Sequence, residues 1–219
     1  MTAVDAAEQM LAEAQTSCAG LPVRWVRGAL PRLGFASGVF EAVVANFVIN
    51  CVSDPRAAVR ELARVVRPGG VVALTVWVSG RTAQSALMME ALQAAKVVPE
   101  RGGGLPAGRD FERTVPGLIG LTRQAGLEPV RSRELAWDWV VSWEDWWTGI
   151  AGGVGSTGQA YLAQDPPTRE RVYRHLRSRV EESEADGMLR LPSVAAYVLA
   201  RSSPLRQSGR RHRGHRVDR

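Results

Sequence analysis

Residues 40–77 decide the fold, and they run FEAVVANFVINCVSDPRAAVRELARVVRPGGVVALTVW. The segment begins with an apolar, β-branched run at Val43–Val48, which predicts a buried strand. Ser53-Asp54-Pro55 then predicts the start of a helix, with Asp54 as its N-cap and Pro55 at the first helical position. The stretch therefore starts as a strand followed by a helix.

The predicted helix has one apolar face, formed by Val59, Leu62 and Val66 at the spacing of a 3.6-residue repeat. Pro68-Gly69-Gly70 predicts the end of the helix, and VVALTVW (71–77) predicts a second strand buried on both faces. A strand–helix–strand unit of this kind implies parallel strands, a right-handed crossover and helices covering the sheet. We therefore expect an α/β fold, doubly wound and Rossmann-like, with a mainly parallel sheet.

The same stretch resembles the class I S-adenosylmethionine-dependent methyltransferases, in particular the small-molecule type 11 group. The resemblance rests on FEAVVANFVINCVSDP (40–55), RELARVVRPGG (60–70) and VALTVW (72–77), although the family usually has Phe-Asp in place of Phe40-Glu41. It extends more loosely over residues 1–201 and implies a C-terminal antiparallel part of the sheet. It also implies direct SN2 methyl transfer to a small molecule. Because alignment of two bound reactants supplies much of such catalysis, we assign no catalytic residue.

The resemblance suggests which residues would contact the cofactor, S-adenosylmethionine. Asp5, at the end of the family's second strand, corresponds to the acid that binds the ribose hydroxyls. Met10 and Leu30 are expected near the adenine, and Asn46 and Phe47 are expected to line the site of methyl transfer. These assignments depend on the family's central strand being present.

Two departures from the family pattern bear on cofactor binding. The family's glycine-rich loop precedes its ribose-binding acid by about 20 residues, but only four residues precede Asp5. The family's first strand, which lies between the strand ending at Asp5 and the strand containing Val43, is therefore missing from an N-terminally truncated fold. Ala29 stands where the family commonly has an aspartate that contacts the adenine. We expect weak or absent cofactor binding, and self-association or aggregation through the open strand edges.

These departures leave three hypotheses. The chain is a small-molecule methyltransferase whose true N-terminus lies upstream of Met1, a non-catalytic degenerate relative that acts as an interaction module, or a nucleic-acid-associated protein. We expect residues 1–80 to form a partial cofactor-binding core and residues 81–200 to form the substrate side of the same domain. Within the second part the patterns predict helices at 81–95, 114–125 and 169–180, and a last strand at 189–200.

The basic charge of the chain lies at its C-terminus. Residues 201–219 contain seven arginines and one acid, Asp218, and the formal net charge of the whole chain is +6. The segment has almost no apolar residues, which predicts a disordered tail. Nucleic-acid contact through phosphates is the weaker interpretation, because no aromatic residues are interleaved and no folded basic face is predicted.

Composition excludes several other classes of protein. No apolar run reaches the ~18 residues of a membrane span, and the N-terminus has no signal-peptide pattern, so we expect a cytoplasmic protein. Cys18 and Cys51 do not form a zinc-binding or disulfide pattern, and we expect no metal site. His175, the one histidine outside the tail, is more consistent with a helix surface position than with a general base.

Five of the seven tryptophans lie in an eleven-residue window that starts at Trp137. Trp137 and Trp139 lie on one face of a predicted strand, and Ser142-Trp143-Glu144-Asp145 predicts a capping box before a short helix that carries Trp146 and Trp147. Such side chains would either fill a core or form the walls of a pocket for an apolar or aromatic acceptor. The resemblance places Trp146 and Trp147 over the active site, as candidate substrate contacts.

Overall fold

The computed structural model describes residues 1–97, 105, 108–181 and 183–204. The elements along the chain are β1 (Thr2–Asp5), α1 (Glu8–Ser17), β2 (Arg24–Arg27), β3 (Phe40–Asn46), α2 (Pro55–Val65), β4 (Val66–Trp77), α3 (Ala83–Ala94), α4 (Val115–Gln124), β5 (Leu127–Ser142), α5 (Trp143–Ala151), α6 (Gly155–Leu162), α7 (Pro166–Glu181) and β6 (Met188–Ser202). The predicted helices at 81–95, 114–125 and 169–180 and the last strand are therefore confirmed. β6 includes Arg201 and Ser202, so the predicted tail begins in a strand, while residues 205–219 lie outside the described residues.

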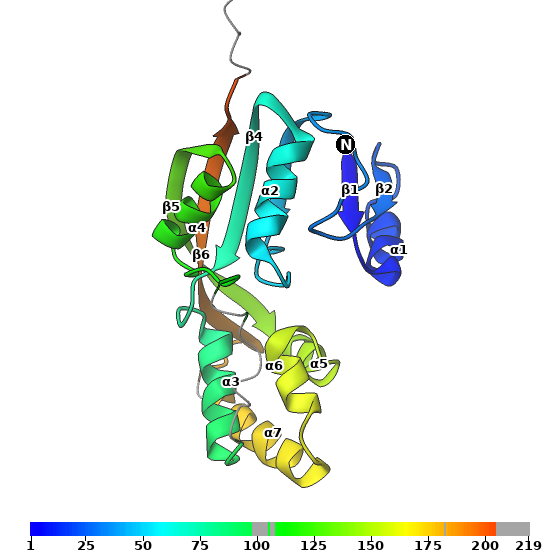
Figure 1. The fold of residues 1–219 in the computed structure, drawn as a ribbon. Helices are drawn as coiled ribbons and strands as arrows, with labels where there is room; N and C mark the ends of the chain where they lie inside the picture. The colour runs from blue at the N-terminus through cyan, green and yellow to red at the C-terminus, as the bar shows by residue number, and fades with distance from the viewer. Residues whose placement is uncertain (98–104, 106–107, 182, 205–219) are drawn as a thin grey trace, which may run out of the picture.

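The strands form two separate sheets (Figure 1). In the smaller sheet β1 and β2 pair in parallel. In the larger sheet the order is β3-β4-β6-β5, with β3 and β4 parallel and β6 antiparallel to both of its neighbours. This confirms an α/β fold with an antiparallel C-terminal part. The larger sheet is mixed, with one parallel and two antiparallel pairs, so the expectation of a mainly parallel sheet is not met. Within the described residues no strand joins β1 to β3, so each of them has an edge without a ladder partner.

The unit β3-α2-β4 forms as its sequence predicts, with one correction. The carboxylate of Asp54 accepts a hydrogen bond from the N–H of Ala57 at 2.9 Å, and Pro55 is the first helical residue. The helix ends at Val65, so Val66 belongs to β4 and the glycines lie within the strand instead of ending the helix. The β3–β4 ladder is irregular at this point. It passes from the Phe40–Val66 pair directly to the Ala42–Val71 pair, so residues 67–70 of β4 have no partner on β3.

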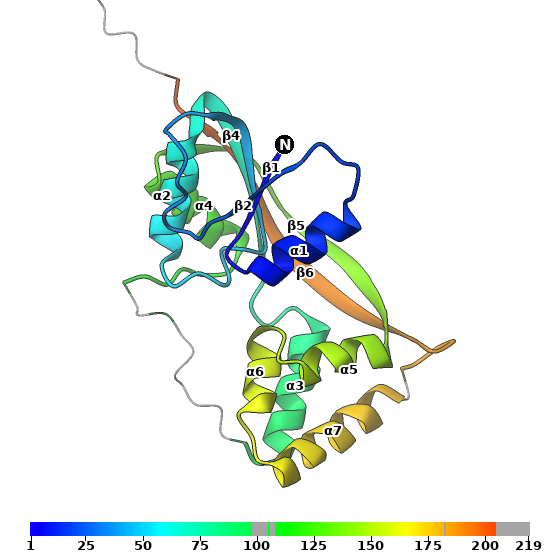
Figure 2. The ribbon, with the colours of Figure 1, turned by 90° about the vertical axis from the view of Figure 1, so that its right-hand side faces the viewer.

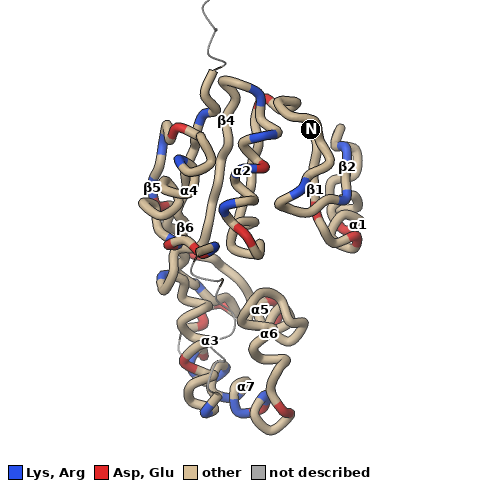
Figure 3. Tube along the Cα trace, in the orientation of Figure 1, with Lys and Arg blue, Asp and Glu red and all other residues tan. Residues whose placement is uncertain are grey.

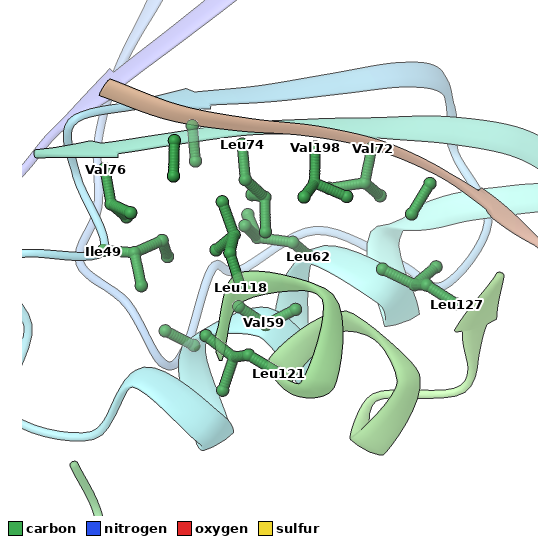
Figure 4. Packing of buried hydrophobic residues seen from close by; sticks show 14 of the residues in the cluster. Ile49, Val59, Leu62, Val72, Leu74, Val76, Leu118, Leu121, Leu127 and Val198 are labelled. Carbon is green, nitrogen blue, oxygen red and sulfur yellow. The ribbon is translucent and has the colours of Figure 1, made fainter. Parts of the chain in front are cut away.

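A first hydrophobic cluster lies between one face of the larger sheet and the helices α2 and α4 (Figure 4). β4 contributes Val72, Leu74 and Val76, each fully buried, and α2 contributes Val59 and Leu62. Val198 of β6 and Leu118 and Leu121 of α4 complete this packing. Segments far apart in the sequence therefore share one core.

The opposite face of the larger sheet is less covered than the sequence predicts. In Figure 2, α2 and α4 lie on one side of β4, β5 and β6, and α1 packs on β1 and β2 of the small sheet. Val71, Ala73 and Thr75 are accordingly only half-buried, and Val44 of β3 is 72% exposed. The expectation that the strand 71–77 is buried on both faces is therefore wrong, because helices cover one face alone.

A second hydrophobic cluster surrounds the far ends of β5 and β6, which extend past the end of β4 as a two-stranded ribbon. Val141 of β5 and Leu189 and Leu191 of β6 pack there against α3, α5 and α7. On α7, the predicted inward face is confirmed, since Val172, Leu176 and Val180 are buried. Charged residues of both signs are distributed along the chain in this part of the molecule (Figure 3).

Candidate functional site

The candidate site lies where the parallel strands β3 and β4 end. Ligands of open α/β sheets bind beyond the carboxyl ends of parallel strands. Asn46 is the last residue of β3 and Phe47 follows it, while Thr75 and Trp77 are at the end of β4. The structure thus brings Asn46 and Phe47, which are candidates from the sequence, next to two residues that the sequence did not single out.

The backbone of Phe47 is held in an unusual conformation at this edge. Its φ is +56°, in the left-handed region, which non-glycine residues adopt at a cost of about 1–3 kcal/mol and most often at functional sites. The N–H of Phe47 donates to the hydroxyl oxygen of Thr75 at 3.0 Å and to its carbonyl at 3.1 Å. The Thr75 hydroxyl in turn donates to Oδ1 of Asn46. A short polar network therefore holds the backbone of Phe47 at the end of β3.

Phe47, Trp77 and Trp137 form an aromatic cluster at the end of β4, which we call the strand-end cluster. The rings of Phe47 and Trp77 are stacked, with centroids 4.1 Å apart and planes 16° apart. The ring of Trp137 lies 5.5 Å from Trp77 and 6.4 Å from Phe47, and is tilted relative to both. The backbone N–H of Trp77 donates to Oδ1 of Asn50 at 3.2 Å, which holds the main chain from which the second ring projects.

The strand-end cluster is open to solvent. Trp137 is 38% exposed, and Phe47 and Trp77 are half-buried. Trp77 pairs across Ala195 of β6 with Leu135 of β5, and Trp137 lies two residues from Leu135, on the same face of the sheet. This is the face opposite α2 and α4, because Val76, the neighbour of Trp77, points into the first hydrophobic cluster. The cluster combines flat apolar surface with strand-end polar groups, a combination that is typical of small-molecule sites.

Asp5 lies at the carboxyl end of β1, in the other sheet. It is exposed, and its Oδ1 accepts a hydrogen bond from the N–H of Ala7 at 2.8 Å. Among the residues that the structure describes, Oδ2 has no hydrogen-bond donor. β1 and β4 run in the same direction in Figure 1, so both strand ends face the same side of the molecule. No described hydrogen bond links Asp5 to the end of β3.

The two residues expected near the adenine differ in their surroundings. Met10 on α1 is 58% exposed, and Leu11 is the one buried residue of this helix. Most of α1 is exposed because its contacts are with the two-stranded sheet of β1 and β2. Leu30 is half-buried against the first hydrophobic cluster. Ala29 is exposed and forms an isolated β-bridge with Arg32. Its methyl side chain provides no carboxylate at this position.

Trp146 and Trp147 lie in the second hydrophobic cluster, away from the strand ends. Trp146 is 6% exposed and Trp143 is 5% exposed. Trp147 stacks on Trp143 with centroids 5.5 Å apart, and Tyr173 packs edge-on against Trp147. Trp146 and Trp147 therefore both contribute to the packing of a hydrophobic core. Their role as substrate contacts remains a prediction.

Ionisable groups near the second cluster are engaged in ion pairs. Glu90 of α3 lies 2.8 Å from Arg179 and 3.5 Å from Nε2 of His175, both on α7. The hydrogen bond from Arg179 lowers the pKa of the Glu90 carboxyl, and His175 contributes less to the same shift. These contacts link α3 to α7. His175 is part of this link, as a partly buried residue on α7 that faces Glu90.

Sequence reasoning missed Trp77, Thr75 and Asn50 as parts of the site. Trp77 ends the strand 71–77, and an aromatic residue at the carboxyl end of a parallel strand is the pattern that could have identified it. The involvement of Trp137 depends on the ladder register between β5 and β6, for which the sequence contains no local indication.

Comparison with known proteins finds a family match over the N-terminal third of the chain. Residues 1–74 match the family model described as methyltransferase domain. An uncharacterized methyltransferase of Mycobacterium tuberculosis is 34% identical over 79 residues, which are 36% of this chain and 40% of that protein. The ubiquinone/menaquinone biosynthesis C-methyltransferase of Roseobacter denitrificans is 28% identical over 155 residues, covering 62% of this chain and 59% of that protein. The chain thus spans about 40% of the length of the first curated relatives it matches.

Solved structures show the fold alone, because their sequence identity is low. A Bacillus halodurans structure titled as a putative methyltransferase superposes with a TM-score of 0.56 at 17% identity, covering 92% of this chain and 82% of that chain. The structure of the [4+2]-cyclase SpnF superposes with a TM-score of 0.52 at 19% identity, covering 93% of this chain and 66% of that chain. The same fold therefore carries more than one chemistry.

No helix in the described part of the chain combines the length and apolar character required to cross a membrane.

Proposed function

We propose that this chain, whose residues 1–74 belong to the methyltransferase-domain family of class I S-adenosylmethionine-dependent enzymes, is a methyltransferase that acts on a small molecule. The observation that carries the proposal is the location of Asn46 and Phe47 at the carboxyl end of a parallel strand, beside an open aromatic cluster. The cofactor, when bound, supplies an electrophilic methyl group on a sulfonium. Direct SN2 transfer of that methyl to an acceptor O, N or C atom is the reaction that this cofactor would support.

The residues present fit the cofactor in part. Asp5 fits the ribose hydroxyls, because it is an exposed carboxylate at a strand end with one oxygen free among the described residues. Asn46 and Phe47 fit the edge at which an acceptor would approach. Ala29 does not fit the adenine amino group, since it offers no acceptor, and one missing polar contact costs about 1–3 kcal/mol of binding.

We further propose that the open edges of β1 and β3 correspond to a strand that these 219 residues do not contain. The two edges belong to separate sheets. β1 and β4 run in the same direction in Figure 1, and β3 is parallel to β4. Filling the gap with a parallel strand followed by a glycine-rich loop would bring backbone N–H groups close to the cofactor. Asp5, Asn46 and Phe47 would then serve one continuous site.

The alternative is a non-catalytic protein built on the same fold. Ala29 in place of a carboxylate and the split between the two sheets favour it. In this alternative, the strand edges would serve as an interaction surface.

Cofactor binding distinguishes the two functions. S-adenosylhomocysteine would be titrated by calorimetry into the 219-residue chain and into a version extended at its N-terminus by a strand, a glycine-rich loop and a helix. We expect binding by the extended chain alone, and an about 5- to 150-fold gain in its affinity on substitution A29D, equivalent to 1–3 kcal/mol.

The matched control is A29N, which adds a side chain of similar size without the charge and should improve binding less than A29D. Absence of binding by a folded extended chain would reject the enzyme in favour of the non-catalytic alternative. Tight binding by the 219-residue chain would show that no further strand is needed.

A further inference from the structure

The strand-end cluster of Phe47, Trp77 and Trp137 is the one aromatic group of the described residues that is both fixed in position and open. The cluster around Trp143 and Trp146 is closed, with those two side chains 5% and 6% exposed. In contrast, Trp137 is 38% exposed and lies next to the ends of two parallel strands. The strand-end cluster is therefore accessible to a ligand without any rearrangement of the core.

Polar groups at this edge hold the main chain that carries two of the rings. Thr75 accepts from the backbone N–H of Phe47 at 3.0 Å, and Asn50 accepts from the backbone N–H of Trp77 at 3.2 Å. Phe47 keeps a left-handed backbone conformation under this constraint. The two rings stack on one another, and side chains restricted by such packing lose little conformational freedom when a ligand binds, which favours affinity.

The geometry of the rings selects between two kinds of ligand. An aromatic site for a cation surrounds it with several ring faces. Here Phe47 and Trp77 stack on one another at 4.1 Å, so the faces they share are not accessible. Trp137 is tilted by 33° from Trp77 and is the most exposed ring of the cluster, at 38%. A planar ring that stacks in an offset arrangement fits this surface better than a cation does.

On the premise of the proposed methyltransferase function, we propose that the methyl acceptor is a planar aromatic compound whose ring stacks on Trp137 at the strand-end cluster. The nucleophilic atom of the acceptor is then held at the carboxyl end of β3. Trp146 and Trp147 take no direct part in this arrangement, because they belong to the closed cluster.

Calorimetric titration without cofactor tests the site directly. The probe is 2-naphthol, and its saturated analogue decahydro-2-naphthol has the same hydroxyl and carbon skeleton without a planar ring. We expect the 219-residue chain to bind 2-naphthol more tightly than the saturated analogue. Substitution W137A should weaken 2-naphthol binding about 2- to 12-fold, which is the range expected for loss of one aromatic pair.

Trp139 provides a matched control on the same strand. It is 37% exposed, close to the value for Trp137, but takes no part in the strand-end cluster. We expect W139A to change 2-naphthol affinity less than twofold and W137F, which keeps a ring, to retain most of it. Equal losses in W137A and W139A, or equal affinity for the two probes, would overturn the aromatic site.

The outcome is separable from that of the proposed function. Loss of the aromatic site would leave S-adenosylhomocysteine binding by the extended chain unchanged. Conversely, naphthol binding that depends on Trp137 would support the aromatic site even if cofactor binding failed. Thermal melting of each variant by circular dichroism shows whether a loss of binding reflects unfolding, and the W137F variant tests the ring if W137A does not fold.

Discussion

Glu61 is the one charged residue among the buried residues that the structure describes. Its carboxylate accepts a hydrogen bond from the N–H of Leu33 at 2.7 Å and pairs with Arg64 at 2.7 Å. Arg64 also donates to the carbonyl of Phe35 at 2.8 Å. These contacts join α2 to the loop after β2, so one carboxylate holds two parts of the first hydrophobic cluster together.

The charge of Glu61 makes a pH-dependent contribution to stability. The hydrogen bond from Arg64, with smaller help from Leu33, lowers the pKa of the Glu61 carboxyl below its ordinary value of 4.5. A lowered pKa in the folded state means that the contribution is complete above about pH 4.5 and is lost as the pH falls through the lower folded-state value. We expect E61Q to destabilise the chain by about 1–3 kcal/mol at pH 7, toward the lower end because Arg64 is 39% exposed.

Urea unfolding at a series of pH values measures this effect. The difference between wild type and E61Q should shrink as the pH is lowered below 4.5. The control is E41Q, because the Glu41 side chain is 83% exposed in its pair with Arg67 and should contribute little at any pH. A difference for E61Q that does not change between pH 7 and pH 3 would contradict the prediction.

At the scale of elements, α2 has its start defined by a local hydrogen bond. The Asp54 side chain accepts from the N–H of Ala57, and the helix packs Val59 and Leu62 into the first hydrophobic cluster. The cap satisfies a backbone N–H in the first turn of the helix, and the packing of its apolar face stabilises the turns that follow.

Substitution D54A should lower the free energy of unfolding by about 0.5–2 kcal/mol, because the N–H of Ala57 loses its acceptor. Thermal or urea denaturation measures the change. Ser53, which precedes the cap and is exposed, provides the control, and S53A should have no clear effect. An S53A variant as unstable as D54A would show that the capping interaction is not the cause.

At the scale of the whole molecule, the separation of the two sheets is the main feature. β1 and β3 each pair on one side alone within the described residues. Val44 of β3 is 72% exposed and Val4 of β1 is 36% exposed, so both edges carry apolar side chains that face solvent. Unpaired edges with exposed apolar residues favour association with further strands.

We expect the 219-residue chain to self-associate in a concentration-dependent manner, as measured by size-exclusion chromatography with light scattering. Substitution V44K should shift the chain toward monomer, because a lysine on an edge strand opposes pairing with another strand. The control is V154K, since Val154 is 69% exposed but lies outside both sheets. A wild-type chain that stays monomeric at high concentration and melts cooperatively would contradict this prediction.

The sequence by itself determined the local elements. Helix capping at Asp54 and Ser142 and the inward face of α7 depend on residues within a few positions of one another, so each could be predicted without tertiary information. The site role of Asn46 and Phe47 was expected from the family resemblance, whereas the local pattern placed both residues inside a strand that ran to Val48; the strand ends at Asn46.

Only the tertiary structure decided which of these elements share a core or a site. Phe47, Trp77 and Trp137 come from three strands, and they meet because β6 lies between β4 and β5 in a particular register. The exposure of Met10, the half-buried face of β4 and the closed packing around Trp146 likewise depend on which surface has a neighbour. A side chain's environment is set by contacts between distant segments, and local sequence patterns do not contain that information.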